Sequence, residues 1–585
     1  MDAITPSPKT GSEALFSDSF ESPTPPEPPV QLPPFAVRVL TKCGYGPRPG
    51  DVSAFNALGG NDDARLNAWL TDQLNPDSIS DTDCNNRISA GNYATYTMSL
   101  SQMWAKYVRG DSQGWPQRYY PCDEAACIKL IRAVYSKRQL YEVMVDFWHN
   151  HFNVQGWEFS IAPVFMHYDR DVMRGKNSSN RFHALGNFRA LLEEVAKAPA
   201  MLVYLDNKSS RGAGFNENFA RELCELHTLG AAHYYPTNDP EEVPLDGNNI
   251  PLGYCDNDVY EAARALTGWT MRDDHWEFPN SPEYDTGEFL YHAPWHDRAG
   301  KYFLGRYMVA NRPALADGHR VFDQLSQHLG TARNICRKLC VRFIGDEPPQ
   351  SLIDSAAALW QSRWDAPDQI AQVLRHILTS AAFKESWGDK VKRPWEALMQ
   401  SLRATSAELT PRVRQPAGVA WNDYADLTTR LHQSGHGPFL WPTPDGYPDR
   451  ASKWQAVSPL AQTWRTLARL TEMRTPGSDA NSPTAYFQRI EQVTRAAFPG
   501  PPQSTAGAVV DFWIGRIYGY ALAQERRDQL VRFLGQKANT AAAATTQLTW
   551  NNEWANEQNP DKYYTLGRLR TTVSLLMMCP EFYHR

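Results

Sequence analysis

Apolar residues recur at helical spacing along almost the whole chain from Phe35 onward, and this periodicity constrains the fold more than any other feature. Phe55, Leu66 and Leu70 belong to one such run, and clusters of proline and glycine separate one run from the next. Strand patterns are rare. The sequence therefore predicts a mostly α fold, a large multi-helical single body with a minor β-hairpin and long irregular loops.

The strongest periodicity marks the individual helices. The clearest predicted helices cover residues 128–152, 188–197, 216–229, 259–269, 332–343, 370–380, 459–470, 508–534 and 566–578. The best strand signals, residues 288–291 and 301–304, flank a polar turn and predict the hairpin. Long polar stretches predict loops at residues 236–256, 280–284 and 475–483.

Composition divides the chain into three parts. Residues 1–34 are dense in proline, serine and acidic side chains, which predicts a disordered tail. Residues 35–403 are expected to form the main helical domain, which carries the candidate site. Residues 404–585 are expected to form a C-terminal helical part packed on it, with a weak boundary signal at residues 403–417.

Charge and composition exclude several classes of protein. A chain of 585 residues with 42% hydrophobic and 21% charged residues is globular rather than disordered or embedded in a membrane. The net charge of −6 argues against nucleic acid as a partner, and no apolar run is long enough to span a bilayer. Nine cysteines without paired spacing do not indicate a disulfide scaffold. The start lacks a conventional secretion signal, so the cytoplasm and export by another route both stay open, as does the oligomeric state.

The most informative stretch is NENFARELCELHTLG, residues 216–230, which predicts a helix that ends at a left-handed Gly230. On a helical wheel one arc holds Glu217, Asn218, Arg221, Glu222 and Glu225, and the other holds Phe219, Leu223, Leu226 and His227. The polar arc fits either a solvated face or a catalytic group of carboxylates. His227 is expected to be a core histidine whose ring bonds a backbone carbonyl.

A second motif, DFWHNHF, covers residues 146–152 at the end of a predicted helix. His149 and His151 are two residues apart, so a regular helix points them to opposite sides and they cannot share one metal. His151 and Asn150 fit either a ligand-binding and proton-transfer role or a core role.

Two further segments are rich in polar side chains. Asp258 and Glu261 have the spacing of a capping box at a helix start. The stretch HAPWHDRAGKYFLG then places His292, His296 and Asp297 in a turn before a strand, where chemistry or an ordinary polar hairpin are both possible.

The stretch GHGPFLWPTPDGYP, residues 435–448, contains too many prolines for a helix. Its aromatics Phe439, Trp441 and Tyr447 therefore project from an irregular loop that either walls a cleft or covers the core. The chain has no dinucleotide-binding, P-loop or nucleophile-elbow motif.

Together these stretches, with FAVRVLTKCGYGPRPGDV, VKRPWEALMQSLRA and LLMMCPEF, resemble the bacterial family called domain of unknown function 1800, from about Phe35 to the C-terminus. The resemblance implies a mostly helical fold and no particular reaction. It implies that the motif positions are Asn150, His151, Glu217, Asn218, Arg221, Glu222, Glu225, His227, Thr267, Trp269, His296 and Asp297. The chain departs from the family by Cys224, where leucine is usual, and by the insertion at residues 236–256.

The clustered carboxylates and the 19 tryptophans favour an enzyme that cleaves a glycan. For hydrolysis, Glu222 or Glu225 is expected to be the general acid and Asp297 the base. For elimination, His151 is expected to take the proton while Asn150 and Arg221 neutralise a sugar carboxylate. The residues expected to bind the saccharide are Asn150, Asn218, His296, Trp269, Trp441 and Tyr447.

Two alternatives stay open. In a metal- or haem-dependent oxidoreductase, His151, His227 and His296 would converge on the metal with Glu225 or Asp297 in support. In a non-enzymatic scaffold or surface-assembly protein, the motifs would serve packing and capping. The cofactor is unassigned, and the leading hypothesis assigns no metal ligands.

Overall fold

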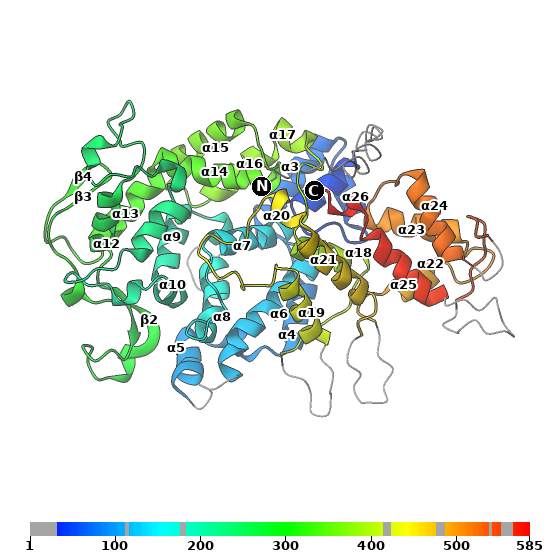
Figure 1. The fold of residues 1–585 in the computed structure, drawn as a ribbon, viewed down its shortest axis with the longest axis horizontal. Helices are drawn as coiled ribbons and strands as arrows, with labels where there is room; N and C mark the ends of the chain where they lie inside the picture. The colour runs from blue at the N-terminus through cyan, green and yellow to red at the C-terminus, as the bar shows by residue number, and fades with distance from the viewer. Residues whose placement is uncertain are drawn as a thin grey trace, which may run out of the picture.

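The computed structural model describes residues 32–110, 116–175, 183–413, 423–474, 486–536, 541–550 and 565–585. In these segments, 26 α-helices and two small antiparallel sheets form one mostly α body (Figure 1). The predicted fold class is confirmed. Residues 1–31 of the predicted tail, the predicted loop 475–483 and residues 414–422 at the predicted boundary lie outside the described residues.

The helices follow one another through most of the chain. In the first half they are α1 (Phe35–Lys42), α2 (Asp51–Asn56), α3 (Asp62–Gln73), α4 (Thr82–Gly91), α5 (Leu100–Met103), α6 (Tyr120–Tyr135), α7 (Gln139–His151), α8 (Phe165–His167), α9 (Phe188–Lys197), α10 (Pro199–Tyr204), α11 (Asn218–Glu222) and α12 (Asp256–Ala265). In the second half they are α13 (Ala316–Gln327), α14 (Leu329–Phe343), α15 (Gln350–Ser362), α16 (Gln369–Leu378), α17 (Ala381–Glu385), α18 (Pro394–Ala404), α19 (Asp423–Gln433), α20 (Ala451–Trp454), α21 (Val457–Leu470), α22 (Ile490–Ala497), α23 (Ala506–Ile517), α24 (Gln524–Gly535), α25 (Thr565–Leu576) and α26 (Pro580–Tyr583). The strands are β1 (Trp269–Asp273), β2 (Asp285–Tyr291), β3 (Lys301–Phe303) and β4 (Arg306–Met308).

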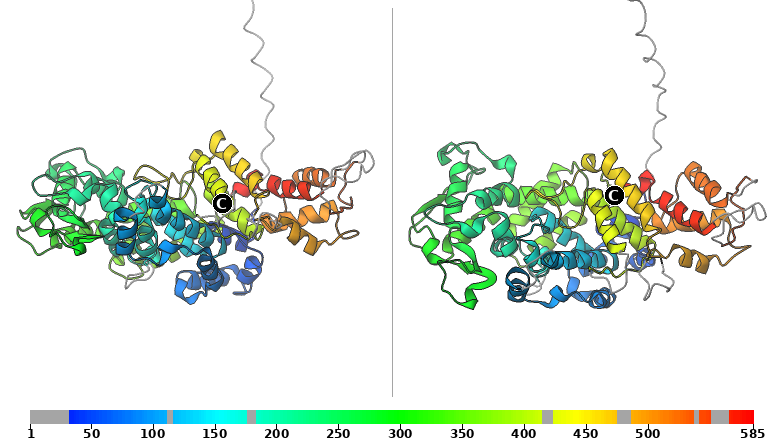
Figure 2. Two further views of the ribbon diagram at one scale, coloured as in Figure 1. Left: turned by 90° about the horizontal axis from the view of Figure 1, so that it is seen from below. Right: turned by 60° about the horizontal axis from the view of Figure 1, so that its bottom comes forward.

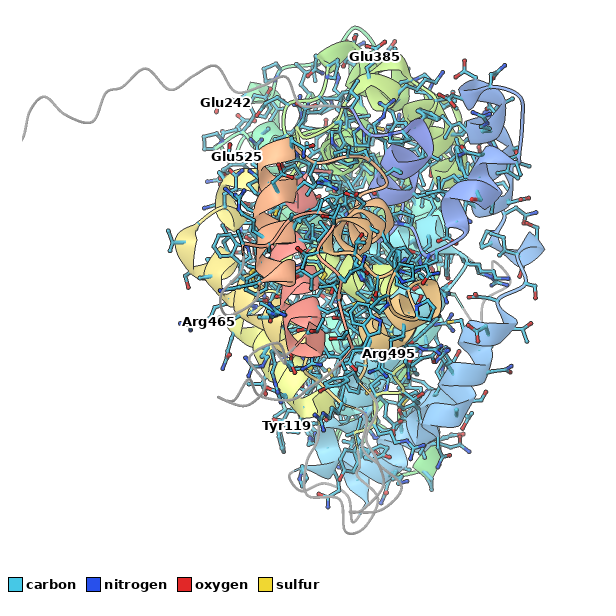
Figure 3. The ribbon with its side chains drawn as sticks, turned by 90° about the vertical axis from the view of Figure 1, so that its right-hand side faces the viewer. Tyr119, Glu242, Glu385, Arg465, Arg495 and Glu525 are labelled. Atoms are coloured by element: carbon cyan, nitrogen blue, oxygen red, sulfur yellow. The ribbon has the colours of Figure 1, made fainter. Side chains whose placement is uncertain are left out.

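The body is longer than it is thick (Figures 1 and 2). The strands, α12 and α13 lie at one end, and α22–α25 lie at the other, with α6, α7 and α18 between them. Figure 3 views the molecule from the second end, where Arg495 of α22 and Glu525 of α24 are labelled. The C-terminal helices contact the rest through α18, since Gln488 and Arg516 donate hydrogen bonds to Ser401 and the Ala404 carbonyl.

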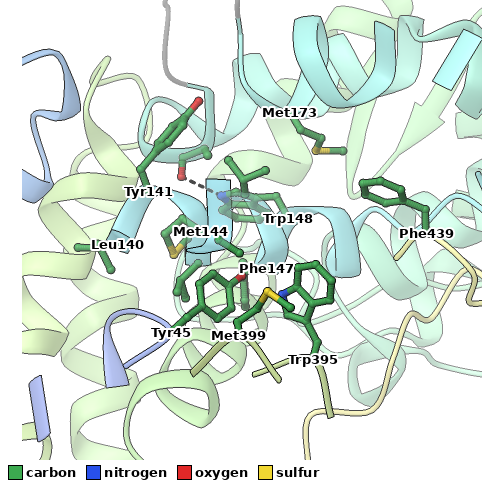
Figure 4. Packing of buried hydrophobic residues seen from close by; sticks show 14 of the residues in the cluster. Tyr45, Leu140, Tyr141, Met144, Phe147, Trp148, Met173, Trp395, Met399 and Phe439 are labelled. Carbon is green, nitrogen blue, oxygen red and sulfur yellow. Dashed lines mark hydrogen bonds between the residues drawn. The ribbon is translucent and has the colours of Figure 1, made fainter. Parts of the chain in front are cut away.

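The core is centred on α7, in which every residue except Asn150 is buried. Trp148 is fully buried and donates its indole N–H to the Ala184 carbonyl at 2.9 Å (Figure 4). Its ring packs edge-on against Phe147 at 4.9 Å between centroids. Because α7 is buried on all sides, its polar side chains need hydrogen-bond or ion-pair partners inside the protein, and its charged residues have such partners.

Several predicted boundaries need correction. The predicted helix 128–152 is two helices, because Ser136 turns the chain and donates its hydroxyl to Asp81 at 2.7 Å. The predicted helix 508–534 is also two, separated around Gly519, whose φ of +73° is left-handed. Periodicity cannot detect a short break between two runs that face the same core.

The predicted hairpin is also wrong. Strand β2 pairs with β1, with Trp269 opposite Tyr291, whereas β3 pairs with β4 across a two-residue turn. Asp258 is not the first residue of the capping box either: α12 starts at Asp256 with Cys255 as its N-cap, and Asp258 completes the capping box by accepting a hydrogen bond from the Cys255 N–H at 3.0 Å. The capping pair therefore lies one turn earlier than predicted.

A buried ionic network joins the two halves of the chain. Glu396 of α18 accepts hydrogen bonds from the side chains of Arg342, Arg393 and Arg585. Burial opposes the ionised form, but the three guanidinium groups hold the pKa of Glu396 well below its usual range. Arg393 also pairs with Asp146 of α7 at 2.8 Å, which extends the network to the helix that carries the DFWHNHF motif.

The substitution Glu396→Gln should lower the free energy of unfolding by about 3–5 kcal/mol, because it leaves buried guanidinium groups without their shared anion. Urea unfolding at pH 7 followed by circular dichroism measures the loss. The control is Glu347→Gln, since the side chain of Glu347 is 82% exposed and its ion pair with Arg450 lies at the surface. Equal midpoints for the two variants would contradict a stabilising role of the network.

Candidate active site

The irregular loop 435–448 is fixed to α7 by two asparagines. The Asn150 amide donates to the Tyr447 carbonyl at 2.8 Å and accepts from the Tyr447 N–H at 2.6 Å. Asn153 donates to the carbonyls of Trp441 and Thr443. Gly446 allows the close approach, because a Cβ there would lie 2.1 Å from the Asn150 carbonyl oxygen. Asn150 thus holds the loop through one N–H group and the oxygen of its amide.

The predicted helix 216–229 is α11 followed by one π-helical segment, η9 (Leu223–His227), and Gly230 has the predicted positive φ of +91°. The helical wheel separated most of the two faces: Phe219, Leu223 and His227 are buried and Glu222 and Glu225 are partly exposed, but Leu226 of the predicted apolar arc is partly exposed as well. A π-bulge is often found at functional sites, because it re-aims side chains within a helix.

On this helix, the Glu222 carboxyl group has a raised pKa. Burial, and then the negative charge of Glu225, raise the pKa of Glu222 to about 6, although Arg221 opposes the shift. Asp445 of the loop also raises the pKa of Glu222. A carboxyl group with this pKa is protonated in a useful fraction near neutral pH and can donate a proton.

Three residues that the sequence did not single out are linked to Glu222: Tyr204 and Asp445 interact with it electrostatically, and Lys338 is linked to it through Asp445. Tyr204 donates its hydroxyl to the Pro442 carbonyl at 2.7 Å and lies within electrostatic range of both Glu222 and Asp445. Asp445 accepts the Trp441 indole N–H at 2.9 Å, and its charge also acts on Lys338. We call Tyr204, Glu222, Glu225, Lys338 and Asp445 the Glu222 site.

His151 and His227 lie beneath this group. His151 contacts the His227 carbonyl through Nε2 at 3.0 Å and the Lys338 ammonium through Nδ1 at 3.2 Å, so both ring nitrogens are engaged. His227 is fully buried as predicted, but neither of its ring nitrogens has a hydrogen-bond partner among the described residues. The expected bond from its ring to a carbonyl is wrong. Burial, and then Lys338, lower the pKa of His227 to about 3, so its ring is neutral.

A polar hollow of about 20 Å³ lies on the other side of Asn150 and has room for about one water molecule. Asp146, Lys129 and His436 line it, and Lys129 binds Asp146 at 2.6 Å. Burial disfavours the ionised form of Asp146, but the positive charges of Lys129 and Arg393 hold the pKa of Asp146 far below its usual range. Asp146 is the first residue of the DFWHNHF motif. A charged residue on a helix that is otherwise apolar predicts a buried ion pair, and this feature of the sequence could have revealed the pair with Lys129.

His296 and Asp297 form a separate group, whose hydrogen bonds and ion pairs hold the turn before β3 in place. His296 contacts the Thr267 carbonyl at 2.9 Å and Asp317 at 3.2 Å, and Lys301, which is 1% exposed, binds Asp317 at 2.8 Å. Asp297 accepts from Arg264 at 2.8 Å. No hydrogen bond or ion pair among the described residues joins this group to Glu222, so Asp297 has no contact that supports its expected role as the base for Glu222.

The remaining predicted residues differ in accessibility. Trp269 is 1% exposed and packs against Phe289 and Phe322, so its ring faces the core rather than a ligand. Asn218 is exposed, and Arg221 pairs with Glu217 and Asp256. In the loop, Tyr447 is buried, whereas Trp441 is partly exposed and packs on Tyr447 at 4.9 Å.

No group of three or more histidine, cysteine, aspartate or glutamate side chains in the described segments is arranged to hold a metal ion. His151 and His227 are neighbours, with ring centroids 6.2 Å apart, but His296 contacts Asp317 in the separate group before β3. All nine cysteines are free. None of the helices that the structure describes has the length and apolar composition needed to cross a membrane.

The order of these motifs along one helical body matches a known family. The sequence model described as "Protein of unknown function (DUF1800)" matches residues 38–584. The chain belongs to this family. No curated protein and no solved structure matches this DUF1800 chain.

The substitution Asn150→Asp should lower the free energy of unfolding by about 1–3 kcal/mol, because a carboxylate cannot donate to the Tyr447 carbonyl and would face it unpaired. Thermal unfolding at pH 7.5 measures the effect. Asn218→Asp makes the same chemical change at an exposed position and should leave the melting temperature nearly unchanged. A similar melting temperature for both variants would show that the loop does not depend on Asn150.

Proposed function

We propose that this DUF1800 protein hydrolyses a glycosidic bond at the Glu222 site. One observation carries the proposal: burial and neighbouring carboxylates raise the pKa of Glu222 to about 6 on a partly exposed helical face, within electrostatic range of Tyr204. A general acid with a raised pKa and a second carboxylate that stays ionised are the two groups that glycoside hydrolysis requires.

In the proposed reaction Glu222 donates its proton to the leaving-group oxygen as the bond to the anomeric carbon breaks. Asp445 replaces the expected Asp297 as the second carboxylate, because its charge acts on Glu222 whereas Asp297 is bound to Arg264. Asp445 takes a proton from the attacking water, which becomes the new hydroxyl of the sugar. Trp441 donates its N–H to Asp445 and offers its partly exposed ring for stacking on a sugar face.

The contacts of His151 support hydrolysis rather than elimination. In an elimination His151 would take a proton from the sugar ring, but its Nδ1 faces the Lys338 ammonium and its Nε2 faces a carbonyl. Burial, and then the charge of Lys338, hold the pKa of His151 well below its usual range, which makes it a weak base. Asn150, the expected partner of His151, is bound to the loop backbone.

The test is a reducing-end assay on a panel of neutral and acidic polysaccharides, with absorbance of unsaturated sugars measured in parallel. Glu222→Gln should reduce the rate by about 10²–10⁴-fold, because it removes the proton donor. Glu217→Gln is the matched control: it makes the same change on the same helical arc, at a group that does not contribute to the pKa of Glu222. Unsaturated products would replace hydrolysis by elimination, and a folded wild-type protein that cleaves nothing in the panel would overturn the proposal.

The raised pKa also predicts a pH dependence. Activity should fall as pH rises through about 6, because Glu222 loses the proton that it donates. Glu222 binds its proton more tightly in the folded state, so its contribution to stability is complete below the ordinary pKa of 4.5 and is lost as pH rises through about 6.

Glu222→Gln should therefore melt at a higher temperature than the wild type above pH 6 and at nearly the same temperature below pH 4.5. Differential scanning calorimetry across this range measures the difference. A constant difference at all pH values would mean that the pKa of Glu222 is not raised.

A further inference from the structure

A larger cavity lies outside the Glu222 site, between α14, the N-terminal end of α15 and the turn that follows η9. Its volume is about 320 Å³, within the range of small-molecule sites. Ala231 and Ala232 of the turn contribute apolar surface, and the side chains of α14 and α15 contribute polar groups.

The polar groups carry an excess of positive charge. Arg333 is paired with Asp354 at 3.1 Å, but Arg337 makes no ion pair with any residue that the structure describes. The Arg337 guanidinium donates to the neutral Gln350 amide oxygen at 2.7 Å, and Gln350 in turn donates to Asp354. Asp354 can neutralise one of the two arginines, so one positive charge at the cavity is left without an anion.

From this combination we infer that the cavity binds a small organic carboxylate with an apolar body. The carboxylate pairs with Arg337, because a guanidinium group presents two parallel N–H donors to a planar anion. The apolar body lies against Ala231 and Ala232. The volume limits the ligand to a compact molecule, and a polymer such as a glycan chain would need an extended groove.

The cavity shares its wall with the segment that carries Glu222. The turn from Leu229 to Ala232 continues directly from η9, and Asn334 of α14 donates to the Thr228 carbonyl at 2.7 Å. Gly230 lies so close to α14 that a Cβ there would be 3.0 Å from the Asn334 side chain. A bound carboxylate therefore contacts both α14 and the turn, and it should hold them together.

The test is isothermal titration calorimetry of the full chain with benzoate, with benzamide as a neutral ligand of the same shape and inorganic phosphate as an anion without an apolar body. Benzoate should bind at least tenfold more tightly than either one. Arg337→Gln should weaken benzoate binding at least tenfold. The matched control is Arg363→Gln, which removes an exposed arginine that does not line the cavity.

Hydrogen exchange locates the binding and does not depend on any catalytic activity. Benzoate should slow exchange in peptides that cover residues 229–233 and 333–337, and Arg337→Gln should abolish this protection. Equal binding of benzoate and benzamide, equal binding of phosphate, or unchanged benzoate affinity in Arg337→Gln would each overturn the inference. Circular dichroism confirms that the variant is folded, which the exposed position of Arg337 favours.

Discussion

The buried carboxylate of Glu396 is the constraint on which the rest of the structure depends. It binds Arg342 of α14, Arg393 just before α18 and Arg585 at the end of the described chain, and Arg393 also pairs with Asp146 of α7. Ion pairs of this kind cost desolvation, so they add stability only when every member is present. The network therefore fixes how three distant parts of the chain meet, and α7 then holds the loop that borders Glu222.

The Glu222 site is assembled by backbone recognition as much as by side chains. Asn150 forms hydrogen bonds with the N–H and the carbonyl of Tyr447, and Asn153 donates hydrogen bonds to two carbonyls of the same loop. These bonds set the position of Asp445. Asp445 lies more than 200 residues after Glu222 in the sequence, yet its charge raises the pKa of Glu222. The motif residues of α7 thus serve the site indirectly.

The sequence predicted the helices best where one amphipathic run had its own cap. Residues 188–197 are an example, because the Asn187 side chain accepts from the Ala190 N–H at the helix start. It failed at Ser136, where the break depends on a contact with Asp81. The wheel of residues 216–229 found Glu222 and Glu225, since burial follows periodicity. It could not find Asp445, since only the folded path of loop 435–448 brings that residue near Glu222, or Tyr204 and Lys338, which come from the separate helices α10 and α14.

The way in which the loop is attached has an evolutionary consequence. Asn150 and Asn153 bind main-chain atoms, so these contacts do not depend on which side chains the bound residues carry. Gly446 is restricted by its close approach to α7, and Gly437 by its close approach to His432. Substitutions at positions such as Trp441 can then alter the surface that the loop presents beside Glu222 while the path of the loop is preserved. A lineage built on this scaffold can diversify its specificity through a few positions of loop 435–448 without a change in the helices.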